Sequence, residues 1–219
     1  MQENQRTEIS TIGEFGLIKR LTEHIQIQNT ETQYGVGDDA AVLDFSNQQT
    51  LVTTDLLMEG VHFDLVYTPL KHLGYKSAIV NFSDIYAMNG TPKQITVSLA
   101  VSKRFCIEDL EQFYEGLQLA CQVHGVDIVG GDTTSSVTGL AISITAIGEG
   151  TPDKLVYRNG AKETDLICVS GNLGAAYMGL QLLEREKALF NRQLQEAQGN
   201  HNCNSGEPCT AQPDFTGRE

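Results

Sequence analysis

The sequence of 219 residues predicts an α+β fold, with strands and helices mixed along the chain (mixed α/β). Apolar residues recur at helical spacing in some segments and alternate with polar residues in others. These two kinds of segment follow one another without a strict strand–helix alternation, which favours α+β over a regular parallel α/β fold. Hydrophobic residues make up 40% of the chain, which is enough for a packed core.

The first predicted element is a helix that opens with a capping box, because Glu14 falls three residues after Thr11. Its apolar positions at helical spacing are Phe15, Ile18, Leu21 and Ile25. Two short strands are expected next, over residues 40–43 and 51–54, with a polar turn between them.

A long helix is predicted from Pro69 to Met88, with Asn89-Gly90 as its end. Alternation predicts a strand over 95–101, and helical spacing returns over 110–121 before Gly125 closes that helix. Short strands are predicted over 126–129 and 140–146. A further apolar run covers 166–169, and a glycine-containing turn at 171–174 leads into a helical stretch through 186.

The composition changes along the chain in a way that predicts two domains. We expect residues 1–150 to form an N-terminal domain and residues 151–219 to form the beginning of a second, incomplete α/β domain. From about Asn191 the sequence is polar and predicts a loop or a disordered tail. The chain is therefore expected to be a fragment or an incomplete gene product.

The formal net charge of −13 bears on the partners of the protein. An acidic surface repels nucleic acids and anionic lipids, so neither is expected as a partner. The N-terminal residues contain no pattern of a secretory signal, and no apolar run approaches the roughly 20 residues that span a membrane. The five cysteines show no disulfide spacing, so we expect a cytoplasmic protein.

Four short segments rich in Asp, Gly and Thr are the candidate site: residues 37–41, 53–55, 81–84 and 130–134. Each segment alone is equally consistent with a turn or a solvent-facing position. Together they offer the carboxylates of Asp38, Asp55, Asp84 and Asp132 and the oxygens of Thr53 and Thr54. Mg²⁺ prefers such oxygen ligands, and a bound cation would relieve the repulsion among the carboxylates and bridge to nucleotide phosphates. Other nucleotide-binding signatures, such as GxxxxGK[ST], are missing from the sequence.

The motifs GEFGLI, GDDAAVL, LVTTDLLMEGVHF, NFSDIYAMNGTPK, GGDTT and GNLGAAYMGLQLL cover about residues 12–187. At these motifs the sequence resembles the thiamine-monophosphate kinase family, within the aminoimidazole-ribonucleotide-synthetase-like superfamily. The resemblance implies a synthetase-like ATP-binding domain with a mixed sheet flanked by helices. It also implies transfer of the ATP γ-phosphate to thiamine monophosphate in thiamine diphosphate biosynthesis, by a homodimer that pairs its N-terminal sheets.

The resemblance also assigns roles to single residues. The implied magnesium ligands are Asp38, Thr53, Thr54, Asp55, Asp84 and Asp132. The implied ATP contacts are Tyr114, Gly131, Asp132 and Arg158, and His62 is the implied contact to thiamine monophosphate. No acid or base side chain is implied, because the metal assists the transfer. For Tyr114, which shares a helix face with Leu110 and Leu117, a packing role is an equal alternative.

Two other functions stay open at this point. The chain is also consistent with another ATP-using synthetase of the same superfamily, or with a noncatalytic fragment that binds nucleotide or dimerises. Family members continue beyond the length of this sequence, which leaves the activity of the chain by itself open.

Overall fold

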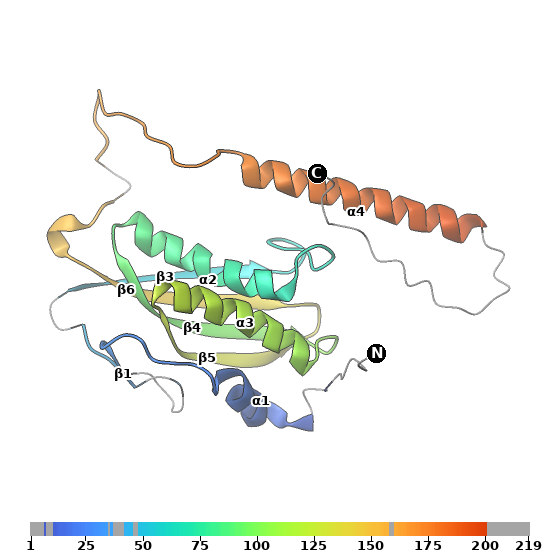
Figure 1. Cartoon of the computed structure of the whole chain (residues 1–219), viewed down its shortest axis with the longest axis horizontal. Coiled ribbons are helices and arrows are strands. Elements are labelled where there is room, and N and C mark those ends of the chain that lie inside the picture. The colour runs from blue at the N-terminus through green and yellow to red at the C-terminus, as the bar shows by residue number, and fades with distance from the viewer. Residues whose placement is uncertain are drawn as a thin grey trace. The chain divides into compact units, whose positions relative to one another are not determined.

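A computed structural model of the chain describes residues 7, 11–34, 36, 42–45, 48–157 and 160–200. The chain forms two compact units, Met1–Gly160 and Ala161–Glu219. The first unit contains a mixed sheet with helices, shown in Figure 1, which confirms the predicted fold class. The functional roles expected for the two domains stay predictions.

The main sheet of the first unit has four strands in the order β3-β6-β4-β5. Their bounds are Gln49–Met58 for β3, Thr91–Ser102 for β4, Asp127–Ser136 for β5 and Ala141–Gly150 for β6. β6 pairs antiparallel with both β3 and β4, whereas β4 and β5 are parallel. The four strands predicted in these regions are confirmed, and β3 and β5 form the two edges of the sheet.

A separate two-stranded sheet joins β1 (Thr32–Tyr34) to β2 (Val42–Leu43). Residues 42–43 of the predicted strand 40–43 are therefore confirmed. Residues 40 and 41 lie outside the described residues.

The described residues of the first unit contain the α-helices α1 (Gly13–Thr22), α2 (Leu70–Ala87) and α3 (Ile107–His124), and a short 3-10 helix at Pro152–Lys154. The helices α2 and α3 cover the same face of the sheet (Figure 1). They enclose a core whose largest fully buried side chains include Phe82, Phe113, Leu73, Ile95, Ile142 and Ile144. Among the described residues no helix is long and apolar enough to span a membrane.

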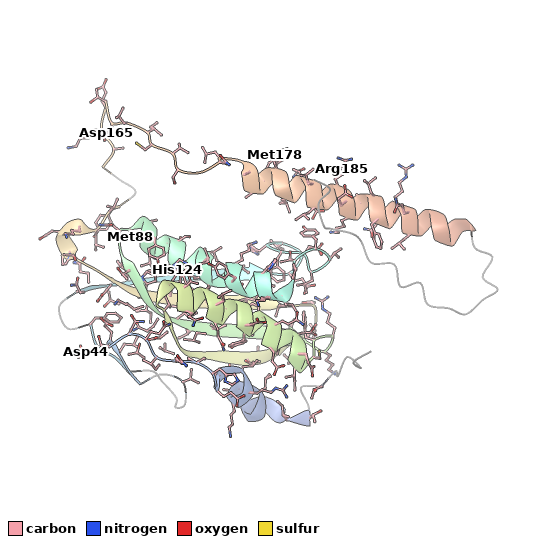
Figure 2. The ribbon with its side chains drawn as sticks, viewed as in Figure 1. Asp44, Met88, His124, Asp165, Met178 and Arg185 are labelled. Atoms are coloured by element: carbon pink, nitrogen blue, oxygen red, sulfur yellow. The ribbon has the colours of Figure 1, made fainter. Side chains whose placement is uncertain are left out.

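The ends of α2 and α3 follow their sequence signals. Pro69 directly precedes α2, and Asn89 with a φ of 58° follows it, as predicted. Gly125 closes α3 in the left-handed conformation, with a φ of 65°. The C-terminal ends of the two helices are joined where the Tyr86 hydroxyl lies 2.9 Å from Nδ1 of His124, the residue labelled on α3 in Figure 2.

Two glycines allow α2 and α3 to pack backbone against backbone. A Cβ atom at Gly74 would lie 1.9 Å from the carbonyl oxygen of Phe113, and one at Gly116 would lie 1.8 Å from that of Lys71. No side chain fits in either place. This close crossing fixes α2 over the sheet and so determines where the polar residues of α2 lie.

Two local predictions are wrong. The capping box expected at Thr11 does not start α1, because the N-cap residue is Ile12 and its side chain makes no cap hydrogen bond. The polar tail expected from about Asn191 is helical up to Asn200, since α4 spans Ala175–Asn200. The residues 192–198 are Arg, Gln, Leu, Gln, Glu, Ala and Gln, all good helix formers, so their polarity is compatible with a helix. Residues 201–219 lie outside the described part.

Candidate functional site

The edge strand β3 and the helix α2 bring together three of the predicted metal ligands. The hydroxyl of Thr53 donates a 2.7 Å hydrogen bond to Oδ2 of Asp84. Thr53 and Asp55 lie two residues apart on β3, so their side chains leave the strand on the same face, which α2 covers. The result is a cluster of one hydroxyl and two carboxylates, which we call the β3–α2 acidic cluster.

Asn81, one helical turn before Asp84, fixes the position of Asp55. Its side chain is fully buried, and its Oδ1 accepts a 3.0 Å hydrogen bond from the backbone N–H of Asp55. Its Nδ2 donates at 3.0 Å to the carbonyl of Ser77 in the preceding turn of α2. Because β3 is an edge strand, some of its backbone N–H and C=O groups have no partner in the sheet, and those that are buried need another hydrogen-bond partner. The Asn81 side chain is that partner for the N–H of Asp55.

Sequence reasoning singled out the segment 81–84 for Asp84 alone and missed the role of Asn81. The signal was an asparagine among apolar positions of α2, where a polar side chain needs a specific partner.

Two other predicted ligands, Thr54 and Asp132, lie apart from the cluster. Strand alternation points Thr54 to the opposite face from Thr53, where its hydroxyl donates to the carbonyl of Ile144 at 3.0 Å. Asp132 is exposed on β5, at the other edge of the sheet, with β6 and β4 between it and β3. Three strand spacings amount to about 14 Å, so Asp55 and Asp132 of one chain do not reach the same ion. Asp38 lies outside the described residues.

The β3–α2 acidic cluster fits Mg²⁺ in the type and number of its donors. All its groups are hard oxygen donors, and Mg²⁺ is usually held by one or two carboxylates together with water and substrate phosphate. Among the described residues no three His, Cys, Asp or Glu side chains gather as a preformed metal cage. The chain therefore offers an open, partial coordination set in which nucleotide phosphates would complete the ligands.

His62 lies exposed in the loop that follows β3. Its Nδ1 accepts a 2.9 Å hydrogen bond from the backbone N–H of Met58, and its own backbone N–H donates to the Met58 carbonyl at 2.9 Å. Because Nδ1 accepts, the proton of the neutral imidazole is on Nε2. The loop thus holds His62 as a hydrogen-bond donor through Nε2.

The predicted ATP contacts have different surroundings. Tyr114 is only 8% exposed, and burial raises its pKa to about 12. Its ring packs edge-on against Phe113, with 5.9 Å between the centroids, so the packing role is present in the structure. A Cβ at Gly131 would lie 1.9 Å from the carbonyl oxygen of Val97, which explains why glycine occupies this position in β5. Arg158 lies outside the described residues.

A buried carboxylate that sequence reasoning missed anchors the segment before residues 37–41. Asp127, at the start of β5, is fully buried. It accepts hydrogen bonds from the backbone N–H of Gln28 (2.5 Å), the backbone N–H of Asn29 (3.1 Å) and the hydroxyl of Thr32 (2.6 Å). An acidic residue at the start of an apolar strand was the available signal. These bonds tie residues 28–32 to the sheet.

Comparisons with known proteins agree with this architecture. The family model "AIR synthase related protein, N-terminal domain" matches residues 37–149. Thiamine-monophosphate kinase of Bacillus subtilis (strain 168) is 37% identical over 176 residues, which cover 80% of this chain and 54% of that protein. The chain thus spans about half the length of the curated relatives it matches.

Two solved structures are similar over most of the chain. The crystal structure of thiamine-monophosphate kinase from Stenotrophomonas maltophilia K279a matches with a TM-score of 0.69 and 34% identity, over 80% of this chain and 54% of that one. A structure of AaThiL complexed with AMPPCP and TMP matches with a TM-score of 0.61 and 34% identity, over 84% of this chain and 56% of that one. The resemblance seen in the motifs is thereby confirmed. From the matched domain we conclude that this chain belongs to the family of AIR synthase related proteins.

Proposed function

We propose that this chain is the ATP-binding part of a thiamine-monophosphate kinase, which transfers the γ-phosphate of ATP to thiamine monophosphate in the cytoplasm. The relatives that carry this name, and the similar structure with AMPPCP and TMP bound, support the proposal. The observation that carries it is the β3–α2 acidic cluster, in which the Thr53 hydroxyl is bonded to the Asp84 carboxylate. In this proposal residues 1–150 bind Mg²⁺ and ATP and dimerise, and residues 151–219 begin a second domain.

The chain's own residues would act by holding charge and position. Thr53 orients the Asp84 carboxylate, and Asn81 holds the backbone from which the Asp55 side chain projects, so these positions are set before any ligand arrives. These carboxylates would hold Mg²⁺, which would neutralise charge on the phosphates of the nucleotide. Phosphoryl transfer depends mainly on positioning and electrostatic stabilisation. In this proposal the cluster therefore needs no side chain that accepts a proton.

The direct test is formation of thiamine diphosphate from thiamine monophosphate and ATP by the 219-residue chain. We expect product that depends on Mg²⁺ and disappears when EDTA is added or when thiamine replaces thiamine monophosphate. Magnesium-dependent ATP binding is measured on the same sample by titration calorimetry. ATP binding without thiamine diphosphate formation would favour a noncatalytic fragment, and turnover with another acceptor would favour another synthetase of the superfamily.

We further propose that the chain forms a homodimer through the face of the sheet that α2 and α3 leave open. On this face β3 carries the apolar side chains of Val52, Leu56 and Met58, which are 65%, 56% and 37% exposed. A second copy would cover them.

Leu56→Glu is expected to disrupt this dimer, because it puts a carboxylate into an apolar contact on each copy. Analytical ultracentrifugation at micromolar concentration should show a dimer for the parent chain and a monomer for the variant. Val137→Glu, at a fully exposed valine between β5 and β6, is the matched control and should stay dimeric. A parent chain that sediments as a monomer would contradict the proposal.

A further inference from the structure

We propose that Lys76 belongs to the acceptor site, where its ammonium group and Nε2–H of His62 together bind the phosphate monoester of the substrate. The inference rests on the proposed kinase function and adds a specificity residue to it. Neither the motifs nor the predicted metal ligands point to this lysine. Its position relative to His62 and to the β3–α2 acidic cluster does.

The contacts between α2 and β3 place Lys76 at the far end of one line of polar groups. Asp84 meets Thr53, and one turn earlier on α2 Asn81 meets Asp55. Nearer the start of α2, the Lys76 ammonium donates a 2.9 Å hydrogen bond to the carbonyl of His62, just beyond the end of β3. The helix and the strand therefore run in opposite directions.

The two ends of this line of polar groups carry opposite charges. Lys76 and Asp84 are eight residues apart, which corresponds to about 12 Å along a helix. The acidic end can hold a metal-bound nucleotide, and the basic end can hold a second anion. In the proposed transfer an oxygen of the acceptor's phosphate forms a bond to the γ-phosphorus while the bond from that phosphorus to ADP breaks, so the phosphate chain of the nucleotide would extend from the β3–α2 acidic cluster toward Lys76.

The charge of Lys76 is not neutralised by the part of the chain that the structure describes. Lys71 on the same helix pairs with Glu115, and Lys93 pairs with Glu31 and Glu149. Lys76, by contrast, is exposed, and its hydrogen-bond partner there is the neutral carbonyl of His62. A lysine ammonium has three donors, so two stay free for a ligand.

His62 adds a second donor at the same place. The Met58 N–H occupies Nδ1 at 2.9 Å, which leaves the proton on Nε2. A phosphate monoester presents several acceptor oxygens and nearly two negative charges at neutral pH. A cationic donor beside a neutral N–H donor matches this group, whereas the corresponding alcohol offers neither the charge nor the additional oxygens.

The test is equilibrium binding of thiamine monophosphate and of thiamine to the 219-residue chain, compared for Lys76→Met, Lys76→Arg and Lys71→Met. We expect Lys76→Met to weaken thiamine monophosphate binding about 10- to 100-fold, the usual effect of a hydrogen bond to a charged group. Thiamine binding and Mg²⁺-dependent ATP binding should not change. Lys76→Arg should restore the preference for the phosphate ester, and Lys71→Met should retain it.

The outcomes separate this inference from the function on which it rests. If the parent chain prefers thiamine monophosphate and Lys76→Met keeps that preference, the assignment of Lys76 is wrong and the kinase proposal stands. Equal weakening of thiamine and thiamine monophosphate would mean that Lys76 only supports the loop, which also overturns the assignment. A parent chain that binds the two compounds equally would overturn the proposed acceptor and this inference together.

Discussion

Asp84→Asn is expected to abolish magnesium-dependent formation of thiamine diphosphate, with a loss of at least about 100-fold. Substitution of a residue that only supports a metal ligand already costs 10- to 100-fold in metal affinity or activity, so loss of a carboxylate ligand should cost more. The amide is nearly the same size as the carboxylate but carries no charge for the ion. The rate at saturating ATP and thiamine monophosphate, measured across a Mg²⁺ titration, checks the prediction.

The fold of this variant should persist, because the Asn side-chain oxygen can still accept the hydrogen bond from Thr53. Ser83→Ala is the matched control, since Ser83 is the neighbouring exposed residue and its hydroxyl bonds to the carbonyl of Val80 within α2. It should retain the parent rate. A normally folded Asp84→Asn protein that also turned over at the parent rate would show that Asp84 is not a metal ligand.

Gly116→Ala is expected to destabilise the first unit by about 3 kcal/mol or more, at the upper end of the usual cost of overpacking a core. The new Cβ would lie 1.8 Å from the carbonyl oxygen of Lys71, and backbone atoms of α2 cannot move aside as a flexible side chain would. This steric clash can then be removed only if α2 and α3 move apart. Thermal unfolding followed by circular dichroism should show a midpoint roughly 6–12 °C lower.

Two further variants make this result specific. Gly74→Ala should have a similar effect, because its Cβ would lie 1.9 Å from the carbonyl oxygen of Phe113. Gly179→Ala, in α4, is the control: no atom lies within 4 Å of its Cβ position, and alanine favours a helix. It should leave the unfolding midpoint unchanged or raise it. Wild-type stability in Gly116→Ala would disprove the close crossing of α2 and α3.

Local patterns predicted the helices and strands where the signals act within a few residues. Pro69 before α2 and Gly125 after α3 gave both boundaries, because each residue favours its backbone conformation wherever it occurs. The start of α3 at Ile107 was three residues earlier than its first apolar marker, since Asp109 accepts a hydrogen bond from the backbone of Cys106. That cap involves a cysteine, which is not among the usual N-cap residues.

The sequence by itself determined the residue types of the candidate site and named all three members of the β3–α2 acidic cluster as candidate metal ligands. Thr53, Asp55 and Asp84 were predicted from their segments because each offers a hard oxygen donor. The family resemblance came from the same segments. Residue types and short motifs are local properties, because they can be read from a few consecutive residues without knowing which segments lie beside them in the fold.

Only the tertiary structure decided which of these residues meet. The strand order β3-β6-β4-β5 places Asp132 at the opposite edge from Asp55, although the sequence presents both as acidic residues in or beside strands. The close crossing at Gly74 and Gly116, the bond from Asn81 to Asp55 and the contact from Lys76 to His62 join segments 14 to 45 residues apart. Such contacts depend on how strands pair and helices pack at long range, and hydrophobic periodicity carries no information on that pairing.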